Sequence, residues 1–447
     1  MYRLLKFASA ISIAVTLCSM LPAAEKPLLK VAVLSDIQHY DQPGDWAYGN
    51  FEKALAMLKT QSPEAMIIAG DLVENATSPD AFKSYRSLIN KYFPDRPLPL
   101  VICAGNHDVH STPVRPLENM LKLFCDNLAI PHDNPLLQFI GGYAFITVHD
   151  AREKEFADST LQKLKTLLDK AAAFDQQKPI FVVTHYPPAN TVIASQPDRM
   201  SKLRQILNNY PQVVSLSGHT HYPLEDERCI WQKEFTALTT STLSYGCMAD
   251  CDLFNVCNGI LPFAREVVQM MMMEIYPNKV IFYRYNVEEK REIKPHARWL
   301  LTLPYRPAEA RYTAQRAQQR QAPEFPADAK LFIRYDYGFA YVIFDRAQHN
   351  DMVQYYLVKT AEQLPNGQYA ELGTVKYAAD FYRLNRNRDP REFFKLPAGI
   401  LKAGCVNQIE VDPMETFGKM GKPLVLQYPV PHWWQFKAFS PKSAPQE

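Results

Sequence analysis

Short apolar runs alternate with amphipathic helical patterns over the first half of the chain. The runs have strand length, are rich in Val, Ile and Leu, and span 29–35, 65–69, 98–104, 143–148, 180–184 and 213–217. Between two of these runs, leucines recur at helical spacing from 159 to 174. This alternation predicts an α/β domain of strand and helix units built around a largely buried sheet.

Three later apolar runs have no helical pattern between them. They span 235–242, 267–276 and 280–285, and we interpret them as a second, antiparallel sheet packed on the first. One of them contains four consecutive methionines at 270–273. On a strand these side chains alternate between the two faces, so we expect them to fill the core.

The sequence changes character again after these runs. Positions 303–324 are rich in Arg, Gln and Pro, which is typical of a linker or a surface crossover. Beyond it, short apolar runs without helical spacing, and a Pro365-Asn366-Gly367 turn, predict a small all-β sandwich at 325–432. With an α/β domain at 28–302 and a tail at 433–447, this division suits 447 residues, which exceed what one core usually holds.

The first residues have the three-part pattern of a secretory signal peptide. Basic residues near the start precede an apolar stretch at 7–21 and small residues that end at Ala24. We expect cleavage after Ala24, and therefore export to the periplasm, the medium or the cell surface. The alternative is an uncleaved membrane anchor, but the apolar stretch is shorter than the ~20 residues that span a bilayer. We expect no membrane span after cleavage.

Export to an oxidising compartment would allow cysteines to pair. The candidates are the four cysteines of one region, Cys229, Cys247, Cys251 and Cys257. Disulfides are the preferred interpretation there, with free thiols as the alternative. Cys103 lies within an apolar strand pattern and is expected to be a small buried hydrophobic residue.

The charge balance gives no reason to expect a nucleic acid as the main partner. There are 49 Lys and Arg against 47 Asp and Glu, so the chain as a whole has no charge excess that would attract a nucleic acid. An anionic substrate would have to be attracted by a local charge such as a metal ion.

Polar side chains that can bind metals follow several of the predicted strands. They are Asp36, Gln38, Asp71, Asn106, His107, His185, His219 and His221. In open α/β sheets the ligand crevice lies outside the carboxyl ends of the strands, so residues distant in sequence meet there. Carboxylate, amide and imidazole groups suit Mn, Fe or Zn, and this set is large enough to hold two divalent ions.

The order Asp-x-Gln, Gly-Asp, Gly-Asn-His-Asp, His, Gly-His-x-His resembles the calcineurin-like metallophosphoesterase family over about residues 28–290. The resemblance implies a four-layer αββα sandwich and a hydrolase that acts on phosphoric esters. It implies that one ion is held by Asp36, Gln38, Asp71 and His221. It implies that the other ion is held by Asp71, Asn106, His185 and His219. Asp71 would bridge the ions, and His107 would donate a proton or contact the phosphate.

Two positions depart from common patterns of that family. Most members have His where this chain has Gln38, which offers a neutral oxygen and favours a harder ion such as Mn. The adjacent His39 is the less favoured candidate, because neighbouring side chains tend to point apart. Glu74 stands where purple acid phosphatases have Tyr, so a tyrosinate-bound ferric ion is not expected. His149, at the end of another predicted strand, is kept as a minor candidate for substrate contact.

The resemblance predicts hydrolysis of a small phosphorylated substrate, and two alternatives stay open. A phosphodiesterase or nucleotide pyrophosphatase would use the same metal pair. A catalytically idle surface binding protein would keep the fold without the activity.

The C-terminal segment resembles a fibronectin type III domain from Leu396 through 408–411 to 417–419, although its corner tyrosine would fall at Asn407. Carbohydrate or protein contact is a hypothesis for this segment. Trp433 and Trp434 could stack on sugar or anchor the tail against the catalytic domain.

Overall fold

The computed structural model describes residues 25–39, 45–75, 82–109, 117–149, 154–248, 260–336 and 338–432. The expected signal peptide, Cys251, Cys257 and the tryptophan pair near the C-terminus lie outside these residues. Within them, no helix is both long enough and apolar enough to cross a membrane.

The first domain contains two mixed sheets. The first sheet has the order β12-β11-β10-β1-β2-β3, with β13 paired to β11. Its strands are β1 (Leu29–Leu34), β2 (Ala65–Ala69), β3 (Leu100–Cys103), β10 (Gln269–Tyr276), β11 (Lys279–Asn286), β12 (Arg291–Ile293) and β13 (Trp299–Thr302). The second sheet has the order β4-β5-β6-β7-β9-β8. Its strands are β4 (Leu136–Ile140), β5 (Tyr143–Thr147), β6 (Ile180–Thr184), β7 (Val213–Ser217), β8 (Ile230–Gln232) and β9 (Thr236–Thr239).

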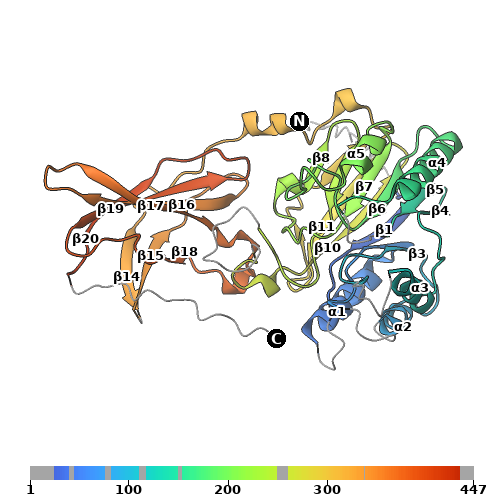
Figure 1. Cartoon of the computed structure of the whole chain (residues 1–447), viewed down its shortest axis with the longest axis horizontal. Helices are drawn as coiled ribbons and strands as arrows, with labels where there is room; N and C mark the ends of the chain where they lie inside the picture. Colours follow the sequence, from blue (N-terminus) through green and yellow to red (C-terminus); the bar gives the residue numbers. More distant parts are fainter. Residues whose placement is uncertain are drawn as a thin grey trace, which may run out of the picture.

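Helices cover the outer faces of both sheets. They are α1 (Trp46–Gln61), α2 (Lys83–Tyr92), α3 (Leu117–Leu128), α4 (Asp158–Phe174) and α5 (Ser201–Leu207). One apolar cluster packs α1, α2 and α3 on the first sheet, another packs α4 and α5 on the second, and a third fills the space between the sheets. Figure 1 shows α1, α2 and α3 on one side of the sheets, and α4 and α5 on the other. The arrangement is the four-layer order of helix, sheet, sheet and helix.

The later strands do not form a separate antiparallel sheet, so that prediction was wrong. β10 pairs antiparallel with β1 and extends the first sheet, whereas β9 pairs in parallel with β7 in the second. The reason is burial, because β10 is apolar on both faces and needs a covered position within a layered sheet. Its methionines alternate as expected: Met271 and Met273 pack between the sheets, and Met270 and Met272 pack against the helices.

The second domain is all β, as predicted. Its sheets have the orders β14-β15-β18 and β17-β16-β19-β20. The strands are β14 (Leu331–Asp336), β15 (Phe339–Asp345), β16 (Val353–Gln363), β17 (Tyr369–Ala378), β18 (Arg391–Lys395), β19 (Val406–Glu415) and β20 (Leu424–Pro429). The predicted turn connects β16 to β17, where the Leu364 N–H donates to Gln368 O at 2.8 Å. Asn407 bonds locally to Lys402 through both side-chain atoms, and the fibronectin type III identity stays a prediction.

The connecting segment lies against the first domain. Arg316 donates to the carbonyls of Glu227 and Ile230, at 2.8 and 2.9 Å. The two domains lie side by side and their apolar cores merge into one cluster (Figure 1). Across the boundary, Arg228 donates to the hydroxyl of Tyr355 at 2.9 Å and Lys294 pairs with Asp351.

Disulfide pairing at Cys229 and Cys247 was predicted and is corrected here. Both carry free thiols, and Cys229 is buried with its Sγ 3.5 Å from the carbonyl oxygen of Pro223. Burial in the apolar core accounts for this residue without a covalent partner. Cys103 is buried in β3, as expected.

Candidate metal centre at the strand ends

The polar residues singled out in the sequence meet at the carboxyl ends of five strands. Asp36 and Gln38 follow β1, Asp71 follows β2, Asn106 and His107 follow β3, His185 follows β6, and His219 and His221 follow β7. Five of these residues have left-handed backbones, with φ between 46° and 69°: Asp36, Gln38, Asp71, His219 and His221. Such conformations are costly for residues other than glycine and cluster at functional sites.

Two glycines make room for the carboxylates. A Cβ atom on Gly218 would lie 2.5 Å from Oδ2 of Asp36, and one on Gly105 would collide with Oδ1 of Asp71. Any side chain at either position would push a carboxylate out of the cluster. The close approach of these glycines to the carboxylates has no local signal in the sequence.

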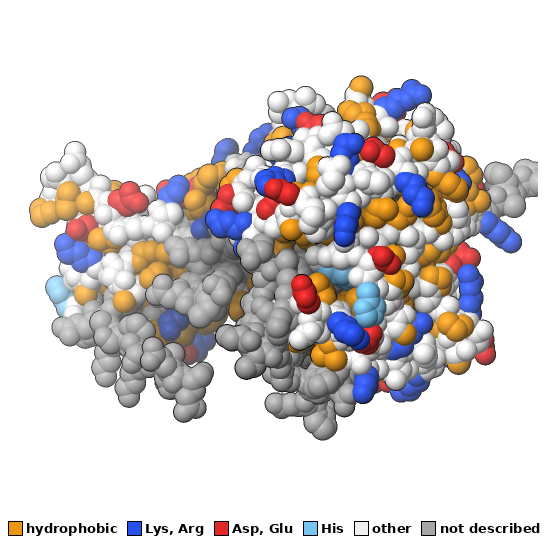
Figure 2. Space-filling view, turned by 45° about the vertical axis from the view of Figure 1, so that its right-hand side comes forward, with side chains coloured by type: hydrophobic (Ala, Val, Ile, Leu, Met, Phe, Trp, Pro, Cys, Tyr) orange, Lys and Arg blue, Asp and Glu red, His pale blue; other side chains and the backbone are white. Residues whose placement is uncertain are grey.

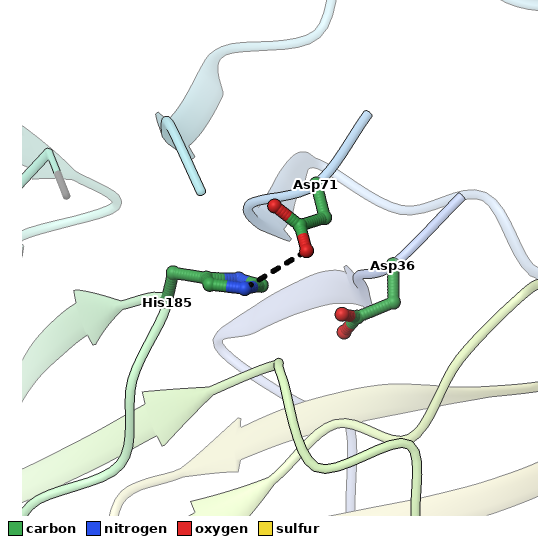
Figure 3. Close-up of side chains that lie close together, drawn as sticks. All are labelled: Asp36, Asp71 and His185. Carbon is green, nitrogen blue, oxygen red and sulfur yellow. Dashed lines mark ion pairs between the residues drawn. The ribbon is translucent and has the colours of Figure 1, made fainter. Parts of the chain in front are cut away.

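Asp71 lies at the centre of the site. Its Oδ1 accepts a hydrogen bond from the backbone N–H of His107 at 2.9 Å, and its Oδ2 lies 3.0 Å from Nε2 of His185. Figure 3 shows the carboxylate of Asp36 turned toward the same space. One ligand atom each from Asp36, Asp71 and His185 lies within 4.8 Å of the others, and all three residues are buried.

Asp36 makes a second, matching pair. One carboxylate oxygen lies 3.1 Å from Nε2 of His221, and both oxygens accept from the backbone N–H of His219 at 3.1 Å. Asp71 and Asp36 therefore each present a carboxylate oxygen to the Nε2 atom of a histidine.

Hydrogen bonds on the far side of each ring define the tautomers of these two histidines. Nδ1 of His185 lies 2.9 Å from the carbonyl of Ala69, and Nδ1 of His221 lies 2.7 Å from the carbonyl of Tyr245. A carbonyl only accepts hydrogen bonds, so Nδ1 carries a proton in both rings and Nε2 is the nitrogen that faces the carboxylate. A ring nitrogen and a carboxylate oxygen at about 3 Å need a proton or a metal ion between them. The donor set therefore fits a metal ion.

Asn106 supplies independent support for this fit. Its Oδ1 is buried and has no hydrogen-bond partner. An unsatisfied buried amide oxygen costs free energy, and oxygen of this kind is a ligand for divalent ions.

Gln38 is buried at the same site. Its Oε1 accepts from the hydroxyl of Ser244 at 2.7 Å. The ring of His39 packs instead against Tyr48 and Tyr85, at centroid distances of 5.1 and 5.6 Å. The ring of His39 thus lies in an aromatic cluster, and Gln38 stays the candidate ligand of the two.

His107 is more accessible than the buried ligand candidates. Its side chain is 28% exposed, and its Nδ1 donates to the carbonyl of Glu74 at 2.6 Å. This contact leaves Nε2 for a substrate. Figure 2 shows histidine side chains on the surface of the first domain, with acidic and basic side chains around them.

Burial and neighbouring charges shift the pKa values of the cluster in opposite directions. Burial alone would raise the pKa of Asp36, but His221 lowers it, and the net shift is downward. Burial alone would lower the pKa of His221, but Asp36 raises it above its usual value. Burial, assisted by His185, holds the pKa of His219 well below its usual value. A histidine kept neutral in this way is suited to bind a metal.

His149 does not reach the site, so its role as a minor substrate contact is corrected. It is buried beneath the loop that follows β3, where its Nδ1 accepts from the N–H of Ala104 at 3.0 Å. Its ring packs against Phe124, at a centroid distance of 5.7 Å. Burial lowers its pKa to about 4, which keeps it a neutral hydrogen-bond acceptor within the core.

Several supporting residues were not singled out in the sequence. Tyr186 packs edge-on against His219 at a centroid distance of 4.1 Å, and the guanidinium of Arg199 lies over the Tyr186 ring. Asp108 is buried and accepts from the N–H groups of Gly105, Leu72 and Val73, which ties the two loops together. Only the position of Asp108 in the Gly-Asn-His-Asp run could have indicated it.

A family model matches most of the first domain. Residues 29–223 match the model described as calcineurin-like phosphoesterase. No curated protein matches the chain.

Similar solved structures share only 10–11% sequence identity with the chain. A dimetal phosphatase from Danio rerio aligns at 10% identity and TM-score 0.41, over 62% of this chain and 99% of that one. A purple acid phosphatase from yellow lupin (Lupinus luteus) seeds aligns at 11% identity and TM-score 0.44, over 61% of this chain and 53% of that one. A 5'-nucleotidase precursor from Thermus thermophilus aligns at 11% identity and TM-score 0.32, over 63% of this chain and 55% of that one. Likenesses at this level carry no argument about function. The segment that matches this family model contains every candidate ligand from Asp36 to His221.

Proposed function

We propose that the chain hydrolyses small phosphate esters with two divalent metal ions held at the strand ends. The carrying observation is the pair of contacts in which Nε2 of His185 and Nε2 of His221 face carboxylate oxygens at 3.0 and 3.1 Å. In both rings Nδ1 is bonded to a carbonyl.

Each candidate ligand has a place in this proposal. One ion would be held by Asp36, Gln38, Asp71 and His221, and the other by Asp71, Asn106, His185 and His219. Asp71 is assigned to both ions for two reasons. One of its oxygens faces His185, and its carboxylate has an oxygen within 4.8 Å of one from Asp36. When bound, two such metal ions activate a water molecule and neutralise charge on a phosphate.

The metal is proposed to be Mn, Fe or Zn. The neutral oxygens of Gln38 and Asn106 favour a harder ion such as Mn at their positions. Glu74 occupies the place of the tyrosine of purple acid phosphatases, which argues against a tyrosinate-bound ferric ion.

His107 has the position of a proton donor. Its Nδ1 is bonded to a backbone carbonyl, so the ring is oriented, and its Nε2 can contact a leaving oxygen. A positioned acid of this kind contributes roughly 10² to 10⁴ in rate. Asp71 contributes to the same geometry, because it accepts from the backbone N–H of His107.

The test is hydrolysis of p-nitrophenyl phosphate and bis-p-nitrophenyl phosphate by chelator-stripped protein, with Mn, Zn or Fe added back. We expect activity to require a metal and to be lost in Asp71→Asn. The matched control is Asp169→Asn at an exposed carboxylate paired with Lys165, which should retain activity.

The same assay separates the alternatives. Preference for the diester would favour the phosphodiesterase alternative over a phosphomonoesterase. A folded protein with no turnover under any metal would contradict the proposal and support an idle binding protein.

Export by a signal peptide at 1–24 is proposed from the sequence alone. Sequencing the N-terminus of the mature protein tests it, and a start at Glu25 is expected. A carbohydrate or protein contact through a fibronectin type III-like second domain is likewise a proposal.

A further inference from the structure

A cavity of about 700 Å³ opens beside the candidate metal centre. One wall is formed by Gln38, Glu74 and Tyr245, and the other by Trp46, Ile260, Leu261 and residues 263–266. The size is that of an ordinary small-molecule pocket.

The first wall connects the cavity to the reacting groups. The carbonyl of Glu74 holds His107, the carbonyl of Tyr245 holds His221, and Gln38 is itself a candidate ligand. The Tyr245 ring also lies against the His221 ring, at a centroid distance of 4.5 Å. A phosphate at the metal centre would therefore have this cavity directly beside it.

The second wall is apolar and aromatic. Trp46, Leu261 and Phe263 line it, and the guanidinium of Arg265 lies 4.5 Å from the Trp46 ring centre. Phe263 is 64% exposed and has a left-handed backbone, with φ of 57°. An exposed aromatic residue in a strained conformation is more typical of a binding site than of a core.

The second domain holds this wall in place. Glu266 accepts from Nε of Arg383 and the N–H of Leu384 at 2.9 Å, and from Asn387 at 2.8 Å. The guanidinium of Arg383 lies 3.7 Å from the Phe263 ring centre. Tyr382 donates to the carbonyl of Pro262 at 2.8 Å. The segment that lines the cavity is thus clamped by side chains of the all-β domain.

We infer that this cavity binds the leaving group of the substrate, and that the group is an uncharged alcohol that carries an aromatic ring. The inference rests on the proposed phosphoesterase function. A ring fits walls of Trp46, Leu261 and Phe263. Beside the apolar groups, the described walls contain one acidic side chain, Glu74, and one basic side chain, Arg265. The other acidic side chain of the walls, Glu266, is already paired with Arg383. This balance gives no reason to expect a polyphosphate or another strongly charged leaving group.

The first test measures binding of benzylphosphonate and ethylphosphonate to the metal-loaded protein by calorimetry. Both present the same phosphonate, so their affinity ratio reports the contribution of the ring. We expect benzylphosphonate to bind at least about tenfold more tightly, because the cavity buries the apolar ring. Trp46→Ala should bring the ratio close to one. Equal affinities in the wild type, or an unchanged ratio in Trp46→Ala, would overturn the inference.

Two matched controls accompany this test. Trp231 also has an arginine over its ring, Arg204 at 5.2 Å, but does not line the cavity, so Trp231→Ala should keep the ratio. Arg383→Ala should lower it by loosening the wall. Arg391 stacks over Phe332 at 4.8 Å elsewhere in the second domain, so Arg391→Ala should leave the affinity ratio unchanged. Loss of the preference in the two control variants as well would point to general destabilisation and contradict a specific pocket.

Hydrolysis separates this inference from the proposed function. Benzyl and ethyl phosphate both release a primary alcohol, so the ratio of their kcat/KM values reports mainly leaving-group binding. A binding preference without turnover of any ester would refute the proposed function but support an aromatic-binding pocket. Turnover of both esters at equal kcat/KM would keep the function and refute the pocket.

Discussion

Oδ2 of Asp71 lies 3.0 Å from Nε2 of His185, and both residues are buried. Without a cation, that distance would require a shared proton or a charged histidine. Because Nδ1 of His185 already donates to Ala69, Nε2 is the ring nitrogen that can bind a metal ion in place of that proton. This contact supports a metal site independently of the family match.

His107→Ala is predicted to slow hydrolysis in a way that depends on the leaving group. If His107 donates a proton, the loss should approach about 10² or more for phenyl phosphate and be much smaller for p-nitrophenyl phosphate, which needs less protonation. The measurement is kcat for both esters in the variant and the wild type. Equal losses for the two esters would assign His107 to phosphate binding instead. His349→Ala, at a surface histidine bonded to Gln321, is the control that should change neither rate.

Asn106→Ala is predicted to affect the metal-free and metal-loaded proteins differently. The buried Oδ1 has no hydrogen-bond partner, so removing it should cost the stripped protein little stability. The stabilisation gained by adding Mn should fall, because a ligand is lost. Thermal unfolding with and without Mn checks both expectations.

The control for this prediction is Asn50→Ala. Asn50 is buried too, but its Nδ2 donates to the carbonyl of Leu243 at 2.9 Å. Its removal should destabilise the stripped protein by about 1 to 2 kcal/mol. An Asn106→Ala variant that lost as much stability without metal would contradict a ligand role.

His149 is predicted to make the stability of the stripped protein depend on pH. Burial lowers its pKa to about 4 in the folded state, whereas the unfolded chain has the ordinary value near 6.5. Between these values the unfolded state binds a proton that the folded state does not. Stability therefore falls as pH drops from 6.5 to 4, by up to about 3 kcal/mol from this residue.

Urea unfolding at about pH 7 and about pH 4.5, on either side of the ordinary histidine value, tests the sign. His149→Gln keeps an acceptor for the N–H of Ala104 but removes the proton site, so the variant should lose less stability on acidification than the wild type. His296→Gln, at an exposed histidine, should behave like the wild type. A wild type and His149→Gln with the same pH dependence would show that His149 does not carry the effect.

The sequence predicted the strands of the site well because each is a short, continuous apolar run followed by a polar residue. The runs at 65–69, 180–184 and 213–217 agree with β2, β6 and β7 residue for residue. Local patterns of this kind need no knowledge of the partner strand. The site residues that follow them meet because the carboxyl ends of β2 in the first sheet and of β6 and β7 in the second lie at the same end of the two packed sheets.

What the sequence did not predict depends on pairing and burial. The assignment of β9 and β10 to different sheets follows from which strand each one meets, and an apolar run carries no such information. The interpretation of Cys229 failed for a similar reason, because its spacing suggested a disulfide while the fold buries it alone. The contact of Glu266 with Arg383 joins residues 117 positions apart and has no local signal.

Arg284→Ala is predicted to destabilise the protein by about 3 to 5 kcal/mol, because it removes the fully buried cation of an ion pair and leaves Glu227 with only the weaker ionic contact to Lys294 at 3.4 Å. Arg284 is fully buried, pairs with Glu227 at 2.9 Å and donates to the carbonyls of Leu224 and Ala297. Arg298 makes a similar pair with Glu292 at 2.6 Å but is 43% exposed, so Arg298→Ala should cost less than about 1 kcal/mol. Denaturant unfolding of the two variants compares them directly. Equal costs would mean that burial does not determine how much these ion pairs stabilise the protein.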